Sequence, residues 1–289
     1  ITGENMDWFF EQWLFKPGHP VFEIKSSWNE EEKTLELTIR QVQDTSRNIP
    51  IYKTPVLVGI RMGESNNQIH ASDTVPGLIS QNEIIYKIWI TEAEEYFEFP
   101  LSSKPLLVRF DRGNYLLKEW HFSKSEEELL FQAQNDDVIG RMWAVGELKK
   151  FKDHPRVIKA ILRIARKDSF WAVRKAAVET ISAWSEERFI SFLKDCCLDK
   201  HSRVRATALR SLGDFRRSEL AGFFKEHFSR EDSYLAQAEA LKALGKTGDK
   251  TQIPFLEKAS KFPSYRHIIK NAALEALKLL RSPSPLKNN

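Results

Sequence analysis

Residues 172–177 read AVRKAA and residues 203–208 read RVRATA, so two stretches 31 residues apart share an order of residue types. In each, an arginine stands three positions before the closing alanine. That alanine belongs to a column with successive spacings of 33, 31, 32 and 33 residues: Ala144, Ala177, Ala208, Ala240 and Ala273. Self-similarity at a fixed period of roughly 20 to 50 residues is the signature of stacked structural repeats.

Two further columns keep the same period. The position three before each alanine is basic or an amide: Arg141, Arg174, Arg205, Gln237 and Lys270. The third column is acidic except at its last place: Asp136, Asp168, Asp199, Asp232 and Ser264. A small alanine lets neighbouring helices approach closely, and an aspartate or serine caps the second helix of a pair. The columns predict short HEAT-like repeats, which stack into an armadillo-type α-α solenoid because no unit buries its apolar face alone.

The first part of the chain has a different period. Between residues 21 and 122, apolar and polar residues alternate, which places one set of side chains in a core. The alternating apolar runs are Leu35, Leu37 and Ile39; Val56, Val58, Ile60 and Met62; Phe97, Phe99 and Leu101; and Leu106, Val108 and Phe110. Turn-prone segments separate the runs at 29–33, 44–50, 63–67, 76–77 and 112–114. This pattern predicts about seven short strands in an antiparallel β-sandwich.

The balance of charge changes at the same point as the period. Residues 1–122 hold 12 Lys+Arg against 18 Asp+Glu, whereas residues 123–289 hold 32 against 22. We therefore expect a multidomain, β-then-α chain: a linker helix in residues 1–20, a β-sandwich in 21–122, HEAT-like repeats in 123–281 and a disordered tail in 282–289.

Composition excludes some classes of protein. No stretch approaches the roughly 18 apolar residues that span a bilayer, so no membrane partner is expected. The two cysteines, Cys196 and Cys197, are adjacent and are interpreted as small apolar residues of a helix, which leaves the compartment undefined. The chain starts at Ile1 without a leader-like segment, and we interpret it as a fragment or processed product.

The opening segment does not fit the sandwich pattern. Residues 7–13 read DWFFEQW, with aromatic residues at helical spacing, and Pro17-Gly18 is expected to end that helix before Gly18-His19-Pro20. This order resembles the end of the catalytic domain in aminopeptidase N-type zinc metallopeptidases (peptidase family M-one). Residues 38–43 (TIRQVQ) resemble the family's early sandwich strand, and residues 137–144 (DVIGRMWA) its first helical repeat. The resemblance implies a β-sandwich and then a helical, often HEAT-like, C-terminal domain.

The family's chemistry is not encoded in this segment. A zinc peptidase of this kind needs a His-Glu-x-x-His helix and a downstream glutamate. That motif is absent, because no two histidines lie closer than 26 residues: His19, His70, His121, His154, His201, His227 and His267. We assign no catalytic, cofactor-binding or metal residue to the chain, and His19 is interpreted as fixing a turn. The resemblance places the zinc in a preceding catalytic domain, so this chain alone is expected to bind no stoichiometric zinc and to cleave no aminoacyl substrate.

Three functions remain open at this stage. In the first, the chain is the C-terminal part of a zinc aminopeptidase, whose partners are its own catalytic domain, braced by the sandwich, and peptide substrates, whose access the repeats restrict. In the second, it is a protein-interaction scaffold, because some relatives of this family have lost peptidase function and serve as assembly subunits, including one in general transcription. The third is a HEAT-repeat nucleic-acid binder, which is not favoured because Lys149, Lys150, Lys152, Arg216 and Arg217 are expected mainly at helix ends and turns.

The column that contains Arg141, Arg174 and Arg205 has two interpretations. It is either a ligand-binding ladder, or each arginine pairs with the acid of its own or the next repeat. We favour the structural pairing.

Overall fold

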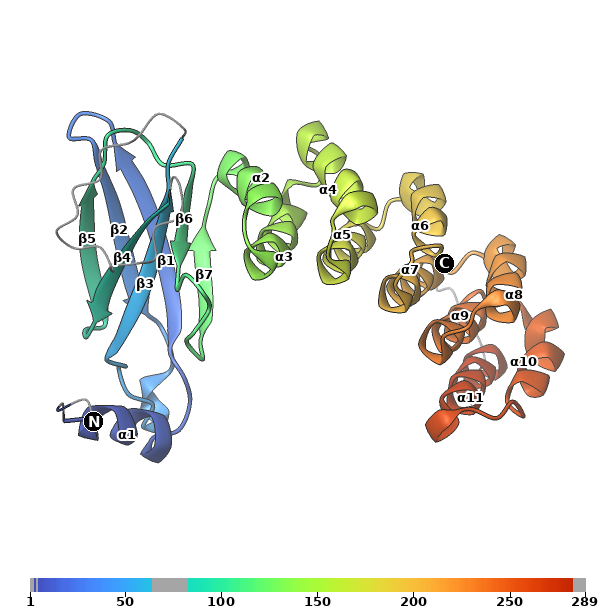
Figure 1. Ribbon diagram of the computed structural model, residues 1–289. Coiled ribbons are helices and arrows are strands. Elements are labelled where there is room, and N and C mark those ends of the chain that lie inside the picture. The colour runs from blue at the N-terminus through green and yellow to red at the C-terminus, as the bar shows by residue number, and fades with distance from the viewer. Residues whose placement is uncertain (1–2, 4, 64–82, 283–289) are drawn as a thin grey trace, which may run out of the picture. The chain divides into compact units, whose positions relative to one another are not determined.

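The computed structural model describes residues 3, 5–63 and 83–282 (Figure 1). The chain divides into two compact units, Ile1–Phe131 (unit 1) and Gln132–Asn289 (unit 2). The turns expected at 64–67 and 76–77, and residues 283–289 of the expected tail, lie outside the described residues.

Unit 1 contains two β-sheets. Its described strands are β1 (Val21–Asn29), β2 (Thr34–Gln41), β3 (Thr54–Arg61), β4 (Glu83–Ile90), β5 (Glu94–Pro100), β6 (Leu107–Phe110) and β7 (Glu119–Ser123). One sheet has the order β5-β2-β1-β7 and the other the order β4-β3-β6. The strand pairs are antiparallel except β1 with β7, which is parallel. This exception is possible because residues 30–118 connect the two strands, whereas a hairpin forces an antiparallel pair.

The two sheets face each other across an aromatic and aliphatic core. The ring centroids of Phe22 on β1 and Phe110 on β6 are 5.1 Å apart. The alternation in β2 is confirmed, since its apolar residues Leu35, Leu37 and Ile39 are at most 2% exposed. The run around β6 differs from a simple alternation, because β6 is buried on both sides and Leu106, just before it, is 41% exposed.

Side chains cover the free edge of β6. The backbone N–H of Val108 donates to Glu128 at 3.0 Å, and the Lys124 ammonium donates to the Val108 carbonyl at 2.5 Å. Lys124 and Glu128 also pair with each other at 2.7 Å. An uncovered edge strand would offer its backbone groups to strands of other chains. These contacts occupy the backbone groups of Val108 and so protect this edge from such pairing.

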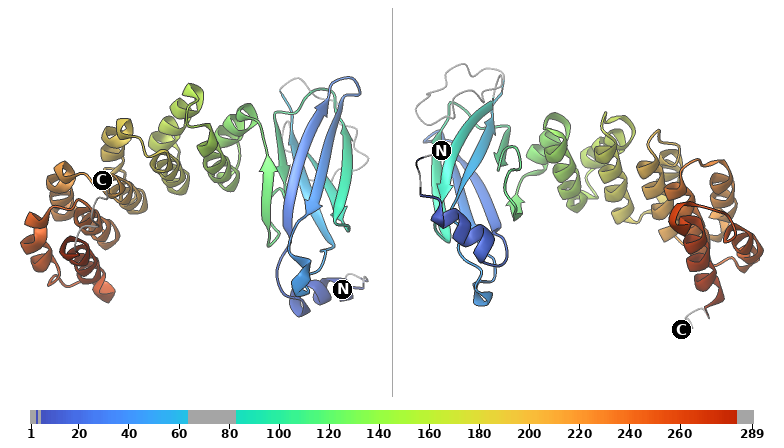
Figure 2. Two further views of the ribbon diagram at one scale, coloured as in Figure 1. Left: turned by 180° about the vertical axis from the view of Figure 1, so that it is seen from behind. Right: turned by 60° about the horizontal axis from the view of Figure 1, so that its bottom comes forward.

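The helices from residue 155 onward form consecutive packed pairs, and two helices between residues 126 and 147 precede them. The first two are α2 (Glu126–Asn135) and α3 (Val138–Glu147). They are followed by α4 (Pro155–Lys167) with α5 (Trp171–Trp184), α6 (Ile190–Cys196) with α7 (Ser202–Asp214), α8 (Ala221–Arg230) with α9 (Tyr234–Lys246), and α10 (Ile253–Ala259) with α11 (Ile268–Arg281). The second helices pack on one another in the order α3, α5, α7, α9 and α11, so unit 2 is a solenoid of HEAT-like repeats (Figure 2). The β-then-α organisation expected from the sequence is confirmed.

The alanine column lies in the core of the solenoid. All five of its members are completely buried: Ala144, Ala177, Ala208, Ala240 and Ala273. Two glycines bring the backbones closer still, because a Cβ on Gly213 would meet Ala243 at 2.8 Å and one on Gly245 would meet Ala276 at 2.5 Å. The repeat period therefore records where consecutive second helices touch.

Candidate interaction surfaces

A short helix is pinned across one end of the sandwich. It consists of α1 (Asp7–Phe10) and a π-helical turn, η1 (Glu11–Phe15). The buried amide of Gln12 donates to the Lys53 carbonyl at 2.6 Å and accepts from the Lys53 N–H at 2.9 Å. The helix ends at Phe15, just before Pro17-Gly18, as predicted, and Gly18 has a φ of +85° that glycine adopts without strain.

This helix leaves an apolar surface open. A groove of about 490 Å³ runs beside it, with Trp8, Phe9, Trp13 and Leu57 among its lining residues. Several side chains exposed on and around the helix are apolar, next to the exposed acids Asp7 and Glu11: Phe10 (47%), Leu14 (66%), Phe15 (74%), Tyr115 (77%) and Leu117 (70%). We call the groove together with these residues the α1 face. Large apolar side chains exposed together in this way are typical of an interaction site.

A ladder of arginines joins the repeats of unit 2. The guanidinium of Arg174 donates to both carboxylate oxygens of Asp199 in the next repeat, at 2.7 and 2.8 Å. It also donates to the Asp168 carbonyl of its own repeat, at 2.9 Å. Arg141 makes the same set of contacts with Asp168 and Asp136. The structural pairing predicted from the sequence is confirmed at these rungs.

The third rung corrects one detail of the sequence prediction. Arg205 pairs mainly with Glu231, whose side chain is 2% exposed, whereas the predicted Asp232 makes a secondary contact and is 91% exposed. The longer glutamate reaches Arg205 from one position earlier, which the period alone does not reveal. Gln237 then stands where the next arginine would be and donates only to backbone carbonyls, including that of Glu231 at 2.7 Å. The arginine ladder ends there.

Each acid of the ladder also orders the turn before a second helix. Asp168 accepts from the Phe170 N–H, Asp199 from the His201 N–H and Glu231 from the Ser233 N–H, at 2.8 to 2.9 Å. Burial would raise the pKa of Glu231, but hydrogen bonds from Arg205 and from the Ser233 backbone lower it from 4.5 to about 2. The three acids are therefore structural groups, paired with an arginine and with the turn of their own repeat.

A second ladder, which the sequence analysis missed, links the first helices. A cation lies over an aromatic ring of the following repeat in the pairs Arg166–Phe192, Lys194–Phe223 and Lys225–Phe255, at 4.6, 5.4 and 5.2 Å. In the sequence, the spacing between these cations and aromatic residues is too irregular to predict which cation meets which ring. Both ladders use charge to hold the stack together, which leaves fewer groups free for a ligand.

Other residues singled out from the sequence lie in ion pairs or in the core. His19 lies 3.0 Å from Glu119 at the start of β7. Lys150 pairs with Glu147 and Arg217 with Glu187. Cys196 and Cys197 are free thiols inside unit 2, and burial raises the pKa of Cys196 to about 12.

Within residues 3, 5–63 and 83–282, no group of three or more His, Cys, Asp or Glu side chains is arranged to hold an ion. His70 lies outside these residues. Among the same residues, no helix is both long and apolar enough to cross a membrane.

Comparison with known proteins gives three results. The chain is 25% identical over 206 residues to transcription initiation factor TFIID subunit 2 of Drosophila melanogaster, in a match that covers 64% of this chain and 17% of that protein. Aminopeptidase A of Legionella pneumophila aligns structurally with 96% of the chain and 33% of its own length, at 13% identity and a TM-score of 0.47. A chain from the complex of CpcE and CpcF of phycocyanin lyase from Nostoc sp. PCC7120 aligns structurally with 55% of this chain and 66% of its own length, at 17% identity and a TM-score of 0.45.

The chain thus spans about a sixth of the length of the curated relative it matches. A sequence profile of HEAT repeats matches residues 126–213 and 199–278, more than half of the chain. The helix pairs, the buried alanine column and this match together establish that the chain belongs to the HEAT-repeat family.

Proposed function

We propose that this chain is the non-catalytic C-terminal part of a zinc aminopeptidase-like protein, in which the sandwich braces a preceding catalytic domain. The observation that carries the proposal is the α1 face. It is formed by the segment whose sequence resembles the end of such a catalytic domain, DWFFEQW at residues 7–13, and by the sandwich residues around it. Aromatic side chains that remain exposed on a pinned helix favour a protein partner over solvent.

The contacts of the helix favour a rigid connection to the sandwich over a flexible tether. Gln12 fixes the helix to Lys53, just before β3, through both the NH2 and the oxygen of its side-chain amide, and the ring of Trp13 lies 4.9 Å from that of Tyr52. A domain that packs on the α1 face would therefore be held in one orientation. In this proposal the HEAT-like repeats restrict which peptides reach the catalytic domain, and the zinc belongs to that domain.

The bracing role is tested in the longer protein with Phe15→Asp. Phe15 is 74% exposed, so the substitution should change the stability of this chain alone by less than about 0.5 kcal/mol. In the longer protein, it should lower the stability of the catalytic domain by about 2 kcal/mol, because the ring would be buried in the interface. Tyr96→Asp is the matched control: Tyr96 is 72% exposed on β5, away from the groove. Equal effects of the two substitutions in the longer protein would refute the bracing role.

A second candidate function is a protein-interaction scaffold from a catalytically inactive relative. The similarity to TFIID subunit 2 favours it, because the family resemblance already includes an inactive assembly subunit of the transcription machinery. The coding sequence upstream of Ile1 separates the two functions. An intact His-Glu-x-x-His with its downstream glutamate supports the peptidase, whereas a degenerate motif in a recognisable catalytic domain supports the scaffold.

A further inference from the structure

The basic residues of the repeat region are concentrated in one segment. Residues 123–289 hold 32 Lys+Arg against 22 Asp+Glu. Residues 149–167 alone hold eight basic residues and a single acid, Asp153. Most of the positive excess of the repeat region therefore lies in η3 (Leu148–Phe151) and α4.

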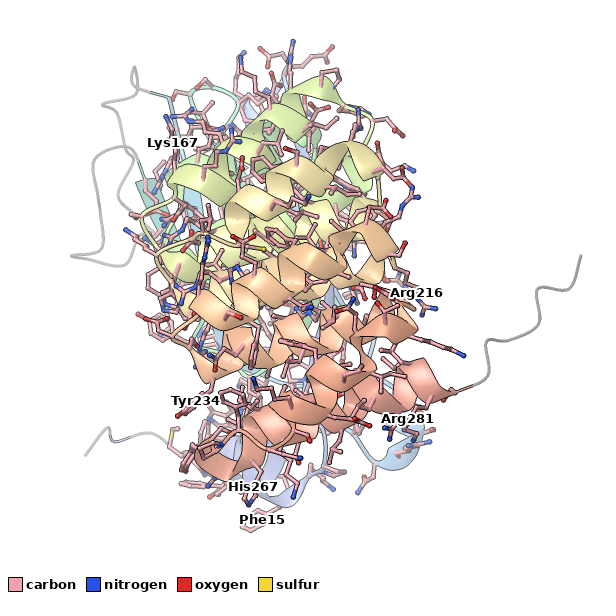
Figure 3. All side chains as sticks on the ribbon, turned by 90° about the vertical axis from the view of Figure 1, so that its right-hand side faces the viewer. Phe15, Lys167, Arg216, Tyr234, His267 and Arg281 are labelled. Carbon is pink, nitrogen blue, oxygen red and sulfur yellow. The ribbon has the colours of Figure 1, made fainter. Side chains whose placement is uncertain are left out.

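α4 is strongly amphipathic. One side buries Val157, Ile161, Ile164 and Ala165 in the solenoid. The other side exposes every basic residue of the helix: Arg156, Lys159, Arg163, Arg166 and Lys167. Steps of three or four residues place these on one stripe, which we call the α4 face. Figure 3 shows its last residue, Lys167, on the same edge of the solenoid as Tyr234 and His267.

The charges of the α4 face are largely unpaired. Arg166 pairs with Asp195 at 3.0 Å. Within the described part of the chain, the other four basic residues form no salt bridge. α4 itself contains no acid, so Lys159, Arg163 and Lys167 repel one another at successive steps of four. Like charges at this spacing weaken a helix, and the chain does not relieve them internally.

We propose that the α4 face is a docking site for an acidic protein segment whose carboxylates are interspersed with apolar side chains. Charge complementarity supplies the attraction. Ile158 and Leu162 are half-buried on α4 between the basic residues, and they offer the apolar contacts that such a segment uses. The next first helix, α6, exposes Ser191 and Asp195, so the basic stripe is one helix wide and about 20 Å long.

These features favour a protein segment over a nucleic acid. A phosphate backbone makes no use of Ile158 or Leu162 and gains most from basic groups on several neighbouring elements. A single stripe with aliphatic residues within it suits a helical or extended peptide instead. This inference stands independently of the packing proposed for the α1 face.

The probe is a fluorescein-labelled peptide of about 16 residues, glutamate with leucine at every fourth position, long enough to lie along α4. Binding to the whole chain is measured by fluorescence anisotropy at low salt. The triple variant Arg156→Gln, Lys159→Gln, Arg163→Gln should weaken binding roughly tenfold. The matched control Lys250→Gln, Lys258→Gln, Lys261→Gln removes the same charge from exposed positions and should leave binding unchanged. Circular dichroism verifies that both variants are folded.

Two further probes decide the class of partner. A peptide with serine in place of leucine should bind several-fold more weakly, because the apolar contacts are lost. A DNA duplex of about 20 base pairs should bind more weakly than the leucine peptide. The proposal is overturned if the duplex binds more tightly through the same three residues, if both triple variants lose equal affinity, or if the leucine peptide does not bind.

Discussion

The guanidinium of Arg174 and the carboxylate of Asp199 form a two-pronged ion pair between consecutive repeats, with side chains only 2% and 11% exposed. Removing one member of such a buried pair leaves the other charge without its partner. Arg174→Ala should therefore lower the free energy of unfolding of unit 2 by about 3 kcal/mol, measured by chemical denaturation. Arg230→Ala breaks an exposed pair with Glu226 and should cost less than about 1 kcal/mol. Similar costs for the two variants would refute the structural role of the ladder.

The ladder makes stability depend on pH. The pKa of Glu231 is lowered from 4.5 to about 2, and that of Asp199 also lies below its usual 3.8. Carboxyl groups with a depressed pKa in the folded state stabilise it fully above their unfolded pKa, and this contribution is lost as pH falls through the folded value. Stability should thus decline between about pH 4.5 and pH 2. Glu231→Gln should flatten part of this decline in thermal unfolding measured across pH, and an unchanged slope would contradict the prediction.

The close contact between α9 and α11 requires a glycine at position 245. A Cβ on Gly245 would lie 2.5 Å from the backbone of Ala276, so Gly245→Ala should destabilise the solenoid although alanine is the better helix former. Gly146 on α3 is exposed and has nothing within 4 Å of its missing Cβ, so Gly146→Ala should raise stability by up to about 1 kcal/mol. The melting temperatures of the two variants should move in opposite directions, and a shared direction would be inconsistent with the packing.

The reactivity of the two buried thiols measures how readily the core of unit 2 opens. Burial raises the pKa of Cys196 to about 12 and that of Cys197 well above 9.0, and the thiolate is the reactive form. At neutral pH the folded chain should react with a thiol reagent far more slowly than the chain in denaturant. Rapid modification of either cysteine without unfolding would show that the core of unit 2 opens readily.

The repeats were predictable because each of their columns reflects one physical requirement. Ala177 and Ala208 must be small where helices touch, and Arg174 must reach the acid of the next repeat. The period did not separate Glu231 from its neighbour Asp232, because side-chain length and burial decide which acid reaches Arg205.

Other features depend on tertiary contacts that no local pattern encodes. The parallel pairing of β1 with β7 joins the two ends of the sandwich segment, so no turn sequence specifies it. The aromatic residues of 7–15 predicted a helix, but their spacing did not indicate that Phe10 and Phe15 remain exposed while Gln12 is buried. Which side chains of this helix are buried depends on the part of the sandwich that the helix packs against.

The most direct test of the proposed bracing role measures whether a preceding domain covers the α1 face. Leu14 is 66% exposed, so the thiol of Leu14→Cys should react quickly with a maleimide in this chain alone, against the slow background of the buried native cysteines. Tyr96→Cys provides an exposed control. We expect Leu14→Cys to be strongly protected in the longer protein, while Tyr96→Cys reacts equally in both. Equal reactivity of Leu14→Cys in both proteins would contradict the proposal that the sandwich braces a catalytic domain through this surface.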